Sequence, residues 1–311
     1  MDFLPARAYR PRWSFVKNSW LPVVTLLASS MLWGLTWLPL KHFGSFGVEG
    51  PLVTLVGHGS VGLLALPLLY RARKSLAPYP GDLVALGFLG GLAQLAFASA
   101  MVLGDVMRVM ALFYLLPAWG VLGGRLILKE RIDRQRGLSL VFALGGAFLI
   151  VGGPAVLKSP PGYVDLLAVA SGLGLGLNNV LFRRLQAVPV TPKVACVFVG
   201  SLVWALPFVV LGRDPLPAAV PPVVWAEVAG FGLIWILIAT AGTLWGVNHM
   251  EAGRSSVLII MELVTAIASA AILTGNMPKP IEWLGGLLIL LSALLEGWRP
   301  GAHAAKAPET A

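Results

Sequence analysis

Charged residues are scarce in this sequence of 311 residues. Asp, Glu, Lys and Arg together make up 12% of the chain, hydrophobic residues make up 57%, and the mean hydropathy is +0.82. An average soluble domain carries about twice that share of charge. Cysteine occurs once, at Cys196, which excludes an intramolecular disulfide and a cysteine-rich metal site. The composition therefore predicts a polytopic membrane protein.

Motifs of the common enzyme classes are also missing. The sequence has no P-loop and no HExxH motif. The stretch GHGSVG at 57–62 departs from a nucleophile elbow because His58 stands where glycine is needed, and GLGLGLNN at 172–179 lacks the GxGxxG spacing. We therefore expect no enzyme, cofactor or metal site. A membrane enzyme or a scaffold remains the alternative class.

Ten runs of about 20 apolar residues are long enough to cross the hydrocarbon core. They lie at residues 20–41, 51–70, 83–104, 106–128, 136–154, 163–183, 193–212, 223–247, 254–274 and 282–298. The runs are apolar all round, whereas strands of a membrane barrel alternate apolar and polar residues. The predicted fold class is an all-α membrane protein with ten transmembrane helices.

The distribution of basic residues predicts the orientation of these spans. With the N-terminus inside, the inner segments hold 18 Lys and Arg residues and the outer loops hold 5. This asymmetry follows the positive-inside rule, so segments 1–19 and 299–311 are predicted to be cytoplasmic, in a bacterial inner membrane. The net charge of +9 is then a consequence of topology and requires no nucleic-acid partner.

The chain contains an internal repeat. Residues 108–130 align without gaps with residues 254–276 at an offset of 146, and the first span resembles the sixth. The predicted domains are therefore two five-helix units, 20–154 and 163–298. Because five is odd, the second unit enters the membrane inverted, and the loop after the ninth span accordingly holds one basic residue, Lys279. Inverted repeats are typical of secondary transporters that work by alternating access.

Several stretches together resemble a known family. They are LWGLTWLPLK (32–41), LFYLLPAWGVLGGRLILKERI (112–132), LNNVLFRRL (177–185) and LIIMELVTAIASAAILTGNMPKPIEWLGGLLIL (258–290). They look like the EamA repeats of the drug/metabolite transporter superfamily. The resemblance implies a ten-helix exporter of small metabolites, and the arrangement is most similar to that of aromatic amino acid exporters.

The sequence departs from the family pattern in the second repeat. Glu262 is followed by Leu263 where the family often has proline, and the span closes with Gly275 and Asn276 instead of Gly-Glu. The first repeat keeps Pro117, and also Lys129 followed by Glu130. The resemblance therefore implies transport without naming the cargo.

Polar and aromatic residues near the middle of the spans are the candidates for a substrate site. A rise of about 1.5 Å per residue places eight of them roughly 13 to 21 Å from the inner end of their span. They are Trp33, His58, Gln94, Tyr114, Trp119, Trp204, Trp235 and Glu262. Asn178 and Asn179 lie lower, where an inner gate would be. Each also has a structural interpretation, since tryptophans pack and polar amides bridge helices in membranes.

Glu262 is the strongest candidate because it has no nearby route to water. A charge at the centre of a spanning helix costs about 2.5 to 3.5 kcal/mol, and such residues face a cavity or a partner. Glu262 could bind a substrate ammonium group or exchange a coupling proton. Alternatively, it is a protonated carboxyl group that holds two helices together.

These observations favour a secondary transporter of small metabolites, and the resemblance favours an amino acid exporter, with an aromatic substrate as the finer hypothesis. A broad exporter of drugs or other metabolites is the alternative. The expected partners are a small-molecule substrate, membrane lipid and coupling protons, and we expect a monomer.

Overall fold

The computed structural model of the chain describes residues 20–130, 132–151, 153, 161–211, 220–250, 255, 258–275 and 277–297. The predicted cytoplasmic segments 1–19 and 299–311 lie outside the described residues, as do Lys158 and Asn276.

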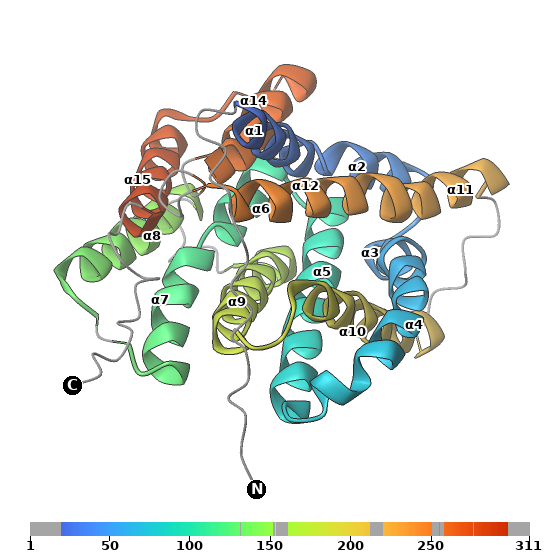
Figure 1. Cartoon of the computed structure of the whole chain (residues 1–311). Helices are drawn as coiled ribbons and strands as arrows, with labels where there is room; N and C mark the ends of the chain where they lie inside the picture. Colours follow the sequence, from blue (N-terminus) through green and yellow to red (C-terminus); the bar gives the residue numbers. More distant parts are fainter. Residues whose placement is uncertain are drawn as a thin grey trace, which may run out of the picture.

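The described residues form helices and connecting turns, without a strand (Figure 1). The first half contains α1 (Leu21–Gly34), α2 (Trp37–Ser45), α3 (Gly50–Val53), the π-helix η1 (Thr54–His58), α4 (Gly59–Leu76), α5 (Pro80–Leu103), α6 (Val106–Phe113), α7 (Leu116–Ile127) and α8 (Arg134–Val151). The second half contains α9 (Tyr163–Arg184), α10 (Val190–Leu211), α11 (Pro222–Gly230), the π-helix η3 (Phe231–Ile236), α12 (Leu237–Asn248), α14 (Met261–Thr274) and α15 (Pro280–Gly297).

Seven helical stretches are long and apolar enough to cross a membrane, among the residues described. They coincide with the first four predicted spans and with the sixth, seventh and eighth. The fifth, ninth and tenth predicted spans correspond to the shorter helices α8, α14 and α15, of 18, 14 and 18 residues. The structure thus confirms an all-helical protein with several membrane spans, whereas the count of ten is not confirmed.

The first predicted span is interrupted between α1 and α2. Pro39 has no N–H to donate to the Leu35 carbonyl four residues earlier, so the helix cannot continue regularly. At the break, the Leu32 carbonyl accepts hydrogen bonds from Thr36 Oγ1 at 3.1 Å and from Trp235 Nε1 at 3.2 Å. A side chain from the second half therefore satisfies a carbonyl group at the break.

The fourth and ninth spans break at equivalent positions. The first break lies at Tyr114, between α6 and α7, and the second lies at Ile260, 146 residues later. Pro117 explains the first, because it cannot donate to the Phe113 carbonyl. The second break has Leu263 at the proline position, and the Leu263 N–H bonds to the Ile260 carbonyl over three residues at 3.0 Å. The break thus persists without its proline.

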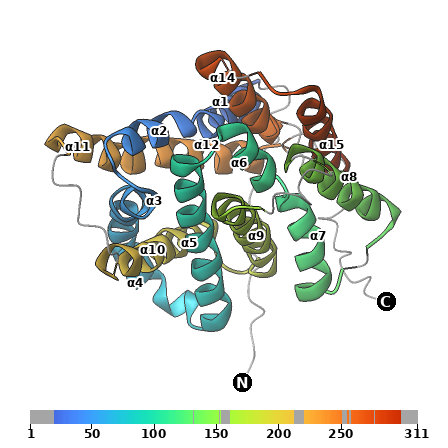
Figure 2. The same ribbon diagram turned by 180° about the vertical axis from the view of Figure 1, so that it is seen from behind.

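Helix contacts between the halves occur in matching pairs. α1 packs against α12 as α9 packs against α5, and α1 packs against α14 as α9 packs against α7. Figures 1 and 2 show α9 between α5 and α7, and α8 beside α15 at one end of the molecule. Glycines permit the closest approaches: a Cβ on Gly174 would lie 2.8 Å from the Leu89 carbonyl oxygen.

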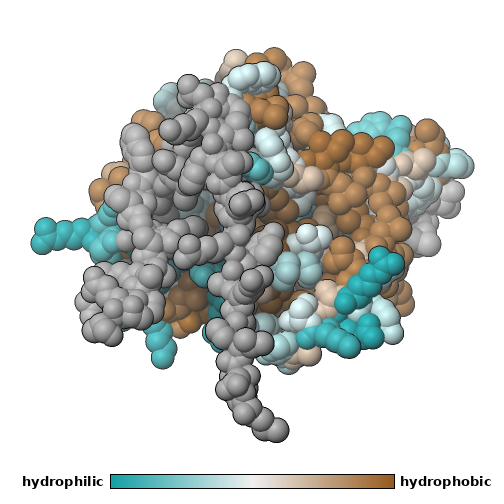
Figure 3. All heavy atoms as spheres, in the orientation of Figure 1, coloured by the Kyte–Doolittle hydropathy of each residue, from teal (hydrophilic) through white to brown (hydrophobic). Residues whose placement is uncertain are grey.

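Apolar side chains cover much of the surface. In Figure 3 they form a broad area right of the centre of the view. Ile234 is 62% exposed and Ile238 is 56% exposed. A contiguous apolar surface of this kind is unfavourable in water. This surface is suited to contact with lipid.

Candidate functional site

Glu262 lies directly after the break in the ninth span, in the first turn of α14. It sits deep in the protein, although part of the residue remains accessible. The Tyr114 hydroxyl, at the matching break of the fourth span, lies beside the Glu262 carboxyl group and interacts with it. The two helix breaks thus bring together one side chain from each half of the chain.

The backbone around Glu262 supports this position. A carboxylate in the first turn of a helix is favoured by the helix dipole. The Glu262 carbonyl oxygen also meets α1 closely, since a Cβ built on Gly34 would lie 2.5 Å from it. Gly34 therefore fixes how near α1 comes to α14 at the level of the carboxyl group.

Two hydrogen-bond donors of the fourth span are buried, and no hydrogen bond of good geometry satisfies them among the described residues. They are the Tyr114 hydroxyl, which does not reach good hydrogen-bond geometry with Glu262, and Trp119 Nε1. An unsatisfied buried polar group costs about 1 to 3 kcal/mol, so such groups call for an explanation. A polar ligand that accepts from these donors would provide one.

Trp37 is a contact residue that sequence analysis missed. It is buried on α2, and its Nε1 donates to Ser269 Oγ at 3.0 Å, which joins the first span to the ninth. Ser269 lies two helical turns after Glu262, on the same side of α14. The spacing of Trp33 and Trp37, four residues apart, was the signal that could have indicated a shared face, but the break at Leu35 separates them.

His58 and Gln94 form a second polar group. His58 ends η1 and is 3% exposed, with its ring between Phe198 and Phe231 at centroid distances of 6.1 and 6.2 Å. Gln94, which is half-buried on α5, is its polar neighbour. His58 Nδ1 has no hydrogen-bond partner within the described part of the chain.

The remaining predicted tryptophans have different surroundings. Trp33 and Trp119 are half-buried and pack against the main apolar core, as does Trp235, whose N–H is already used at the break of the first span. Trp204 lies apart from them: its Nε1 donates to the Phe88 carbonyl at 2.9 Å, and its ring packs 4.8 Å from that of Phe88. Phe88 is 53% exposed, so Trp204 is placed toward the lipid side.

The two asparagines also differ. Asn178 is buried and its Nδ2 donates to the Leu86 carbonyl at 2.7 Å, which ties α9 to α5. Asn179 is exposed. The contact of Asn178 is the helix-bridging role that polar amides often have in membranes.

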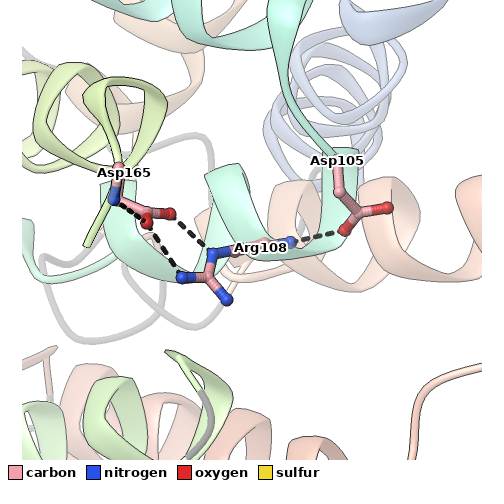
Figure 4. A network of polar contacts seen from close by, with 4 residues as sticks. Asp105, Arg108 and Asp165 are labelled. Atoms are coloured by element: carbon pink, nitrogen blue, oxygen red, sulfur yellow. Dashed lines mark hydrogen bonds and ion pairs between the residues drawn. The ribbon is translucent and has the colours of Figure 1, made fainter. Parts of the chain in front are cut away.

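Ion pairs join spans at the ends of the bundle. Arg108, in the first turn of α6, donates from Nε and Nη2 to the two carboxylate oxygens of Asp165 at 2.6 and 2.8 Å, and its backbone N–H is capped by Asp105 (Figure 4). At the opposite end of α7, Glu130 pairs with Arg136 at 2.8 Å and with Arg183 at 3.0 Å. These pairs fix α6 and α7 to α9.

A further match between the halves appears in two ion pairs. His42, near the end of α2, contacts Glu227 of α11 at 2.9 Å. Arg184, at the end of α9, contacts Asp82 at the start of α5 at 3.1 Å. In each pair, a residue near the end of the first span of one half contacts a residue near the start of the third span of the other half.

No group of three metal-ligating side chains lies together in the residues that the structure describes. The two polar groups together offer one carboxyl group, a phenol, indoles, an imidazole and an amide. Such groups bind zwitterions and polar organic molecules through hydrogen bonds and stacking.

Comparison with known proteins identifies the family. The EamA-like transporter family matches residues 20–152 and again residues 162–296. A solved structure described as "Crystal structure of protein" shares the fold, with a TM-score of 0.56 and 19% identity over 88% of this chain and 96% of that chain. A search of curated proteins found no match. The chain belongs to the EamA-like transporter family, and is thus a membrane transporter of small molecules.

Proposed function

We propose that this transporter exports amino acids by alternating access, and that Glu262 binds the substrate ammonium group or exchanges the coupling proton. The observation that carries the proposal is the pairing of Glu262 with Tyr114 at the matching helix breaks of the two halves. Broken helices near mid-depth are where secondary transporters place substrate and ion sites.

The chemistry of the site suits a zwitterion. Glu262 offers an acceptor for an ammonium group, and the Tyr114 hydroxyl and Trp119 Nε1 offer donors for a carboxylate. Phe97 and Phe113, with ring centroids 5.0 Å apart, belong to the same apolar core as Tyr114 and Trp119. Aromatic neighbours of this kind favour a flat or apolar substrate side chain, which is why we extend the proposal to aromatic amino acids.

The matching contacts of the two halves support an inverted repeat, and the contacts of Lys41 are suited to closing one end of the bundle. Lys41 Nζ of α2 donates to the carbonyls of Val102, at 3.1 Å, and Gly104, at 2.5 Å, so it ties α2 to the end of α5. This contact would help to hold the bundle closed at the end that carries Lys41.

The test is efflux of labelled amino acids from liposomes that contain the purified protein. Wild-type protein should release aromatic amino acids faster than protein-free liposomes do. Glu262→Gln keeps the size of the side chain and removes its charge and titratable proton, so efflux should fall at least about tenfold, the loss expected for one charge-assisted hydrogen bond. Tyr114→Phe should reduce efflux less, because the carboxyl group remains.

Glu49→Gln is the matched control. Glu49 is exposed at the N-cap of α3 and makes no side-chain capping bond, so the same chemical change there should leave efflux unchanged. Normal efflux by Glu262→Gln would leave Glu262 as a helix-packing residue and refute its role. Efflux of many drugs or other metabolites but no amino acid would favour the broad exporter.

Topology is tested separately by cysteine labelling. Cys196 is replaced by Ala, and single cysteines are then placed at positions 131, 158 and 279. A reagent that does not cross membranes should label positions 158 and 279 from outside and spare 131. The opposite pattern would contradict the inverted orientation of the second half.

A further inference from the structure

A groove runs along the lipid-facing side of the molecule, between the first span and the eighth. It has a volume of 430 Å³, and its walls come from α1, α2, α11, η3 and α12. Its apolar lining consists of Leu32, Pro39, Phe43, Gly230, Phe231, Ile234, Trp235 and Ile238, and its polar lining consists of His42 and Glu227.

The groove has a polar end and an apolar end. His42 and Glu227 are paired at 2.9 Å, and their side chains are 50% and 43% exposed. From there the two helices run antiparallel to the contact between Trp235 Nε1 and the Leu32 carbonyl. Polar groups thus lie at one end only, as at a membrane surface.

The length of the groove matches one leaflet of a bilayer. Leu32 lies ten positions from His42, which is about 15 Å at the rise of a helix, and Ile238 lies eleven positions from Glu227, which is about 17 Å. The hydrocarbon core is about 30 Å thick. An acyl chain that starts at the level of the ion pair would therefore reach the other end of the groove near the bilayer midplane.

The corresponding face of the other half is covered by protein. There the third span is α5, and α10 packs along it: Leu86 is fully buried, and a Cβ on Gly90 would lie 2.7 Å from Val197 of α10. On the grooved side, in contrast, a Cβ on Gly230 meets no described atom within 4 Å. The groove is thus a place where the pseudosymmetric packing of the protein leaves a helix face open to lipid.

We propose that the groove binds one phospholipid with a primary ammonium head group, its acyl chain along Phe231, Ile234 and Trp235 and its ammonium group at Glu227. The Glu227 carboxyl group lies 2.9 Å from the His42 ring and is 43% exposed, so its carboxylate can also accept a hydrogen bond from a lipid ammonium group. A primary ammonium group is positively charged and can donate a hydrogen bond to the carboxylate. A phosphoglycerol head group has no positive charge to offer. The proposal is independent of the transported substrate.

The groove also adjoins the candidate site. Phe231 forms one wall of the groove and contacts the His58 ring on its other side, and Trp235 closes the break of the first span. A bound chain therefore packs against residues that hold η1 and α1 in place. A bound lipid could therefore affect the positions of η1 and α1, which belong to spans with candidate substrate-site residues.

The test is photocrosslinking in nanodiscs with phosphatidylethanolamine that carries a diazirine in its acyl chain, followed by mapping of the labelled peptides. Adducts should concentrate on residues 227–238 and 32–43. Gly230→Leu fills the groove and should reduce these adducts at least about fivefold, since the acyl chain loses its packing surface. Glu227→Gln should reduce them about twofold to fivefold, the range for a solvent-accessible ion pair.

Gly286→Leu is the matched control, because a Cβ on Gly286 of α15 likewise meets no described atom within 4 Å. It should leave the adducts on residues 227–238 unchanged. Gly230→Ala adds one carbon into open space and should fold as the wild type does, with an intermediate loss of adducts. Uniform labelling of all lipid-facing helices, or equal labelling by phosphatidylglycerol, would overturn the proposal.

Discussion

A single methyl group at Gly34 should disturb the candidate site from a distance. In Gly34→Ala the new Cβ would lie 2.5 Å from the Glu262 carbonyl oxygen, 2.8 Å from Thr265 Cβ and 3.1 Å from the Ala266 nitrogen. Ordinary contacts begin at 3.4 Å, so α1 and α14 must separate by about 0.9 Å. Glu262 moves with α14, away from the helix that carries Trp33.

The magnitude follows from two opposed effects. Overpacking of this kind costs about 1 to 3 kcal/mol, and alanine in place of a helical glycine returns about 0.8 to 1 kcal/mol. The variant should therefore unfold at a lower temperature, with a net cost of about 1 kcal/mol. A displaced carboxyl group should reduce efflux by about tenfold, since loss of a charge-assisted hydrogen bond is worth about 1.5 kcal/mol.

The assay pairs thermal unfolding in detergent with efflux from liposomes. Gly286→Ala is the control: it makes the same change in α15, where the Cβ meets no described atom within 4 Å, and should be neutral or slightly stabilising. If Gly34→Ala matches the wild type in both measurements, the close approach of α1 and α14 does not position Glu262, and the reasoning fails.

Three further predictions use the same assays. In a double-mutant cycle, Arg108→Gln and Asp165→Asn should each lower the unfolding temperature, because the pair is bidentate and partly buried. The double variant should lose less stability than the sum of the two single losses, and additive losses would contradict a direct interaction. Lys41→Met should raise the labelling of cysteines placed at the end of α5, because two carbonyl contacts are lost; unchanged labelling would show that Lys41 does not close this end. Trp204→Phe should leave efflux within about twofold of the wild type, since Trp204 packs on exposed Phe88; a large loss would place Trp204 in the transport path.

Hydropathy was sufficient for the helical fold because each span must satisfy its own backbone in lipid. It could not predict how the spans break. Pro39 and Pro117 were visible in the sequence and explain two interruptions, but the break at Ile260 has no proline, and the π-helices η1 and η3 carry no local signal. Gly57 and Gly232 let these two π-helices touch: a Cβ on Gly232 would overlap the Gly57 backbone. Such contacts depend on residues 175 positions apart.

Counting residues along a span gives depth but not direction around the helix axis. Trp204 and Trp119 were placed at similar depth, yet one packs toward lipid and the other packs against the core with its N–H buried. Trp37 was passed over, although it joins the first span to the ninth. The direction of a side chain is set by the neighbouring helices, and their arrangement is a property of the whole chain.

Symmetry of the chain explains why one pairing could have been anticipated. The offset of 146 places Tyr114 at the position of Ile260, two residues before Glu262, so the repeat itself relates the two breaks. In an inverted repeat, equivalent positions of the fourth and ninth spans meet across the pseudo-twofold axis, and α6 does contact α14. The second repeat has Ile260 where the first has Tyr114, and Glu262 where the first has Leu116, so the two halves carry unlike groups at equivalent positions. Unlike groups let a site offer different chemistry to the two ends of an asymmetric molecule, which is the arrangement that the proposed amino acid substrate needs.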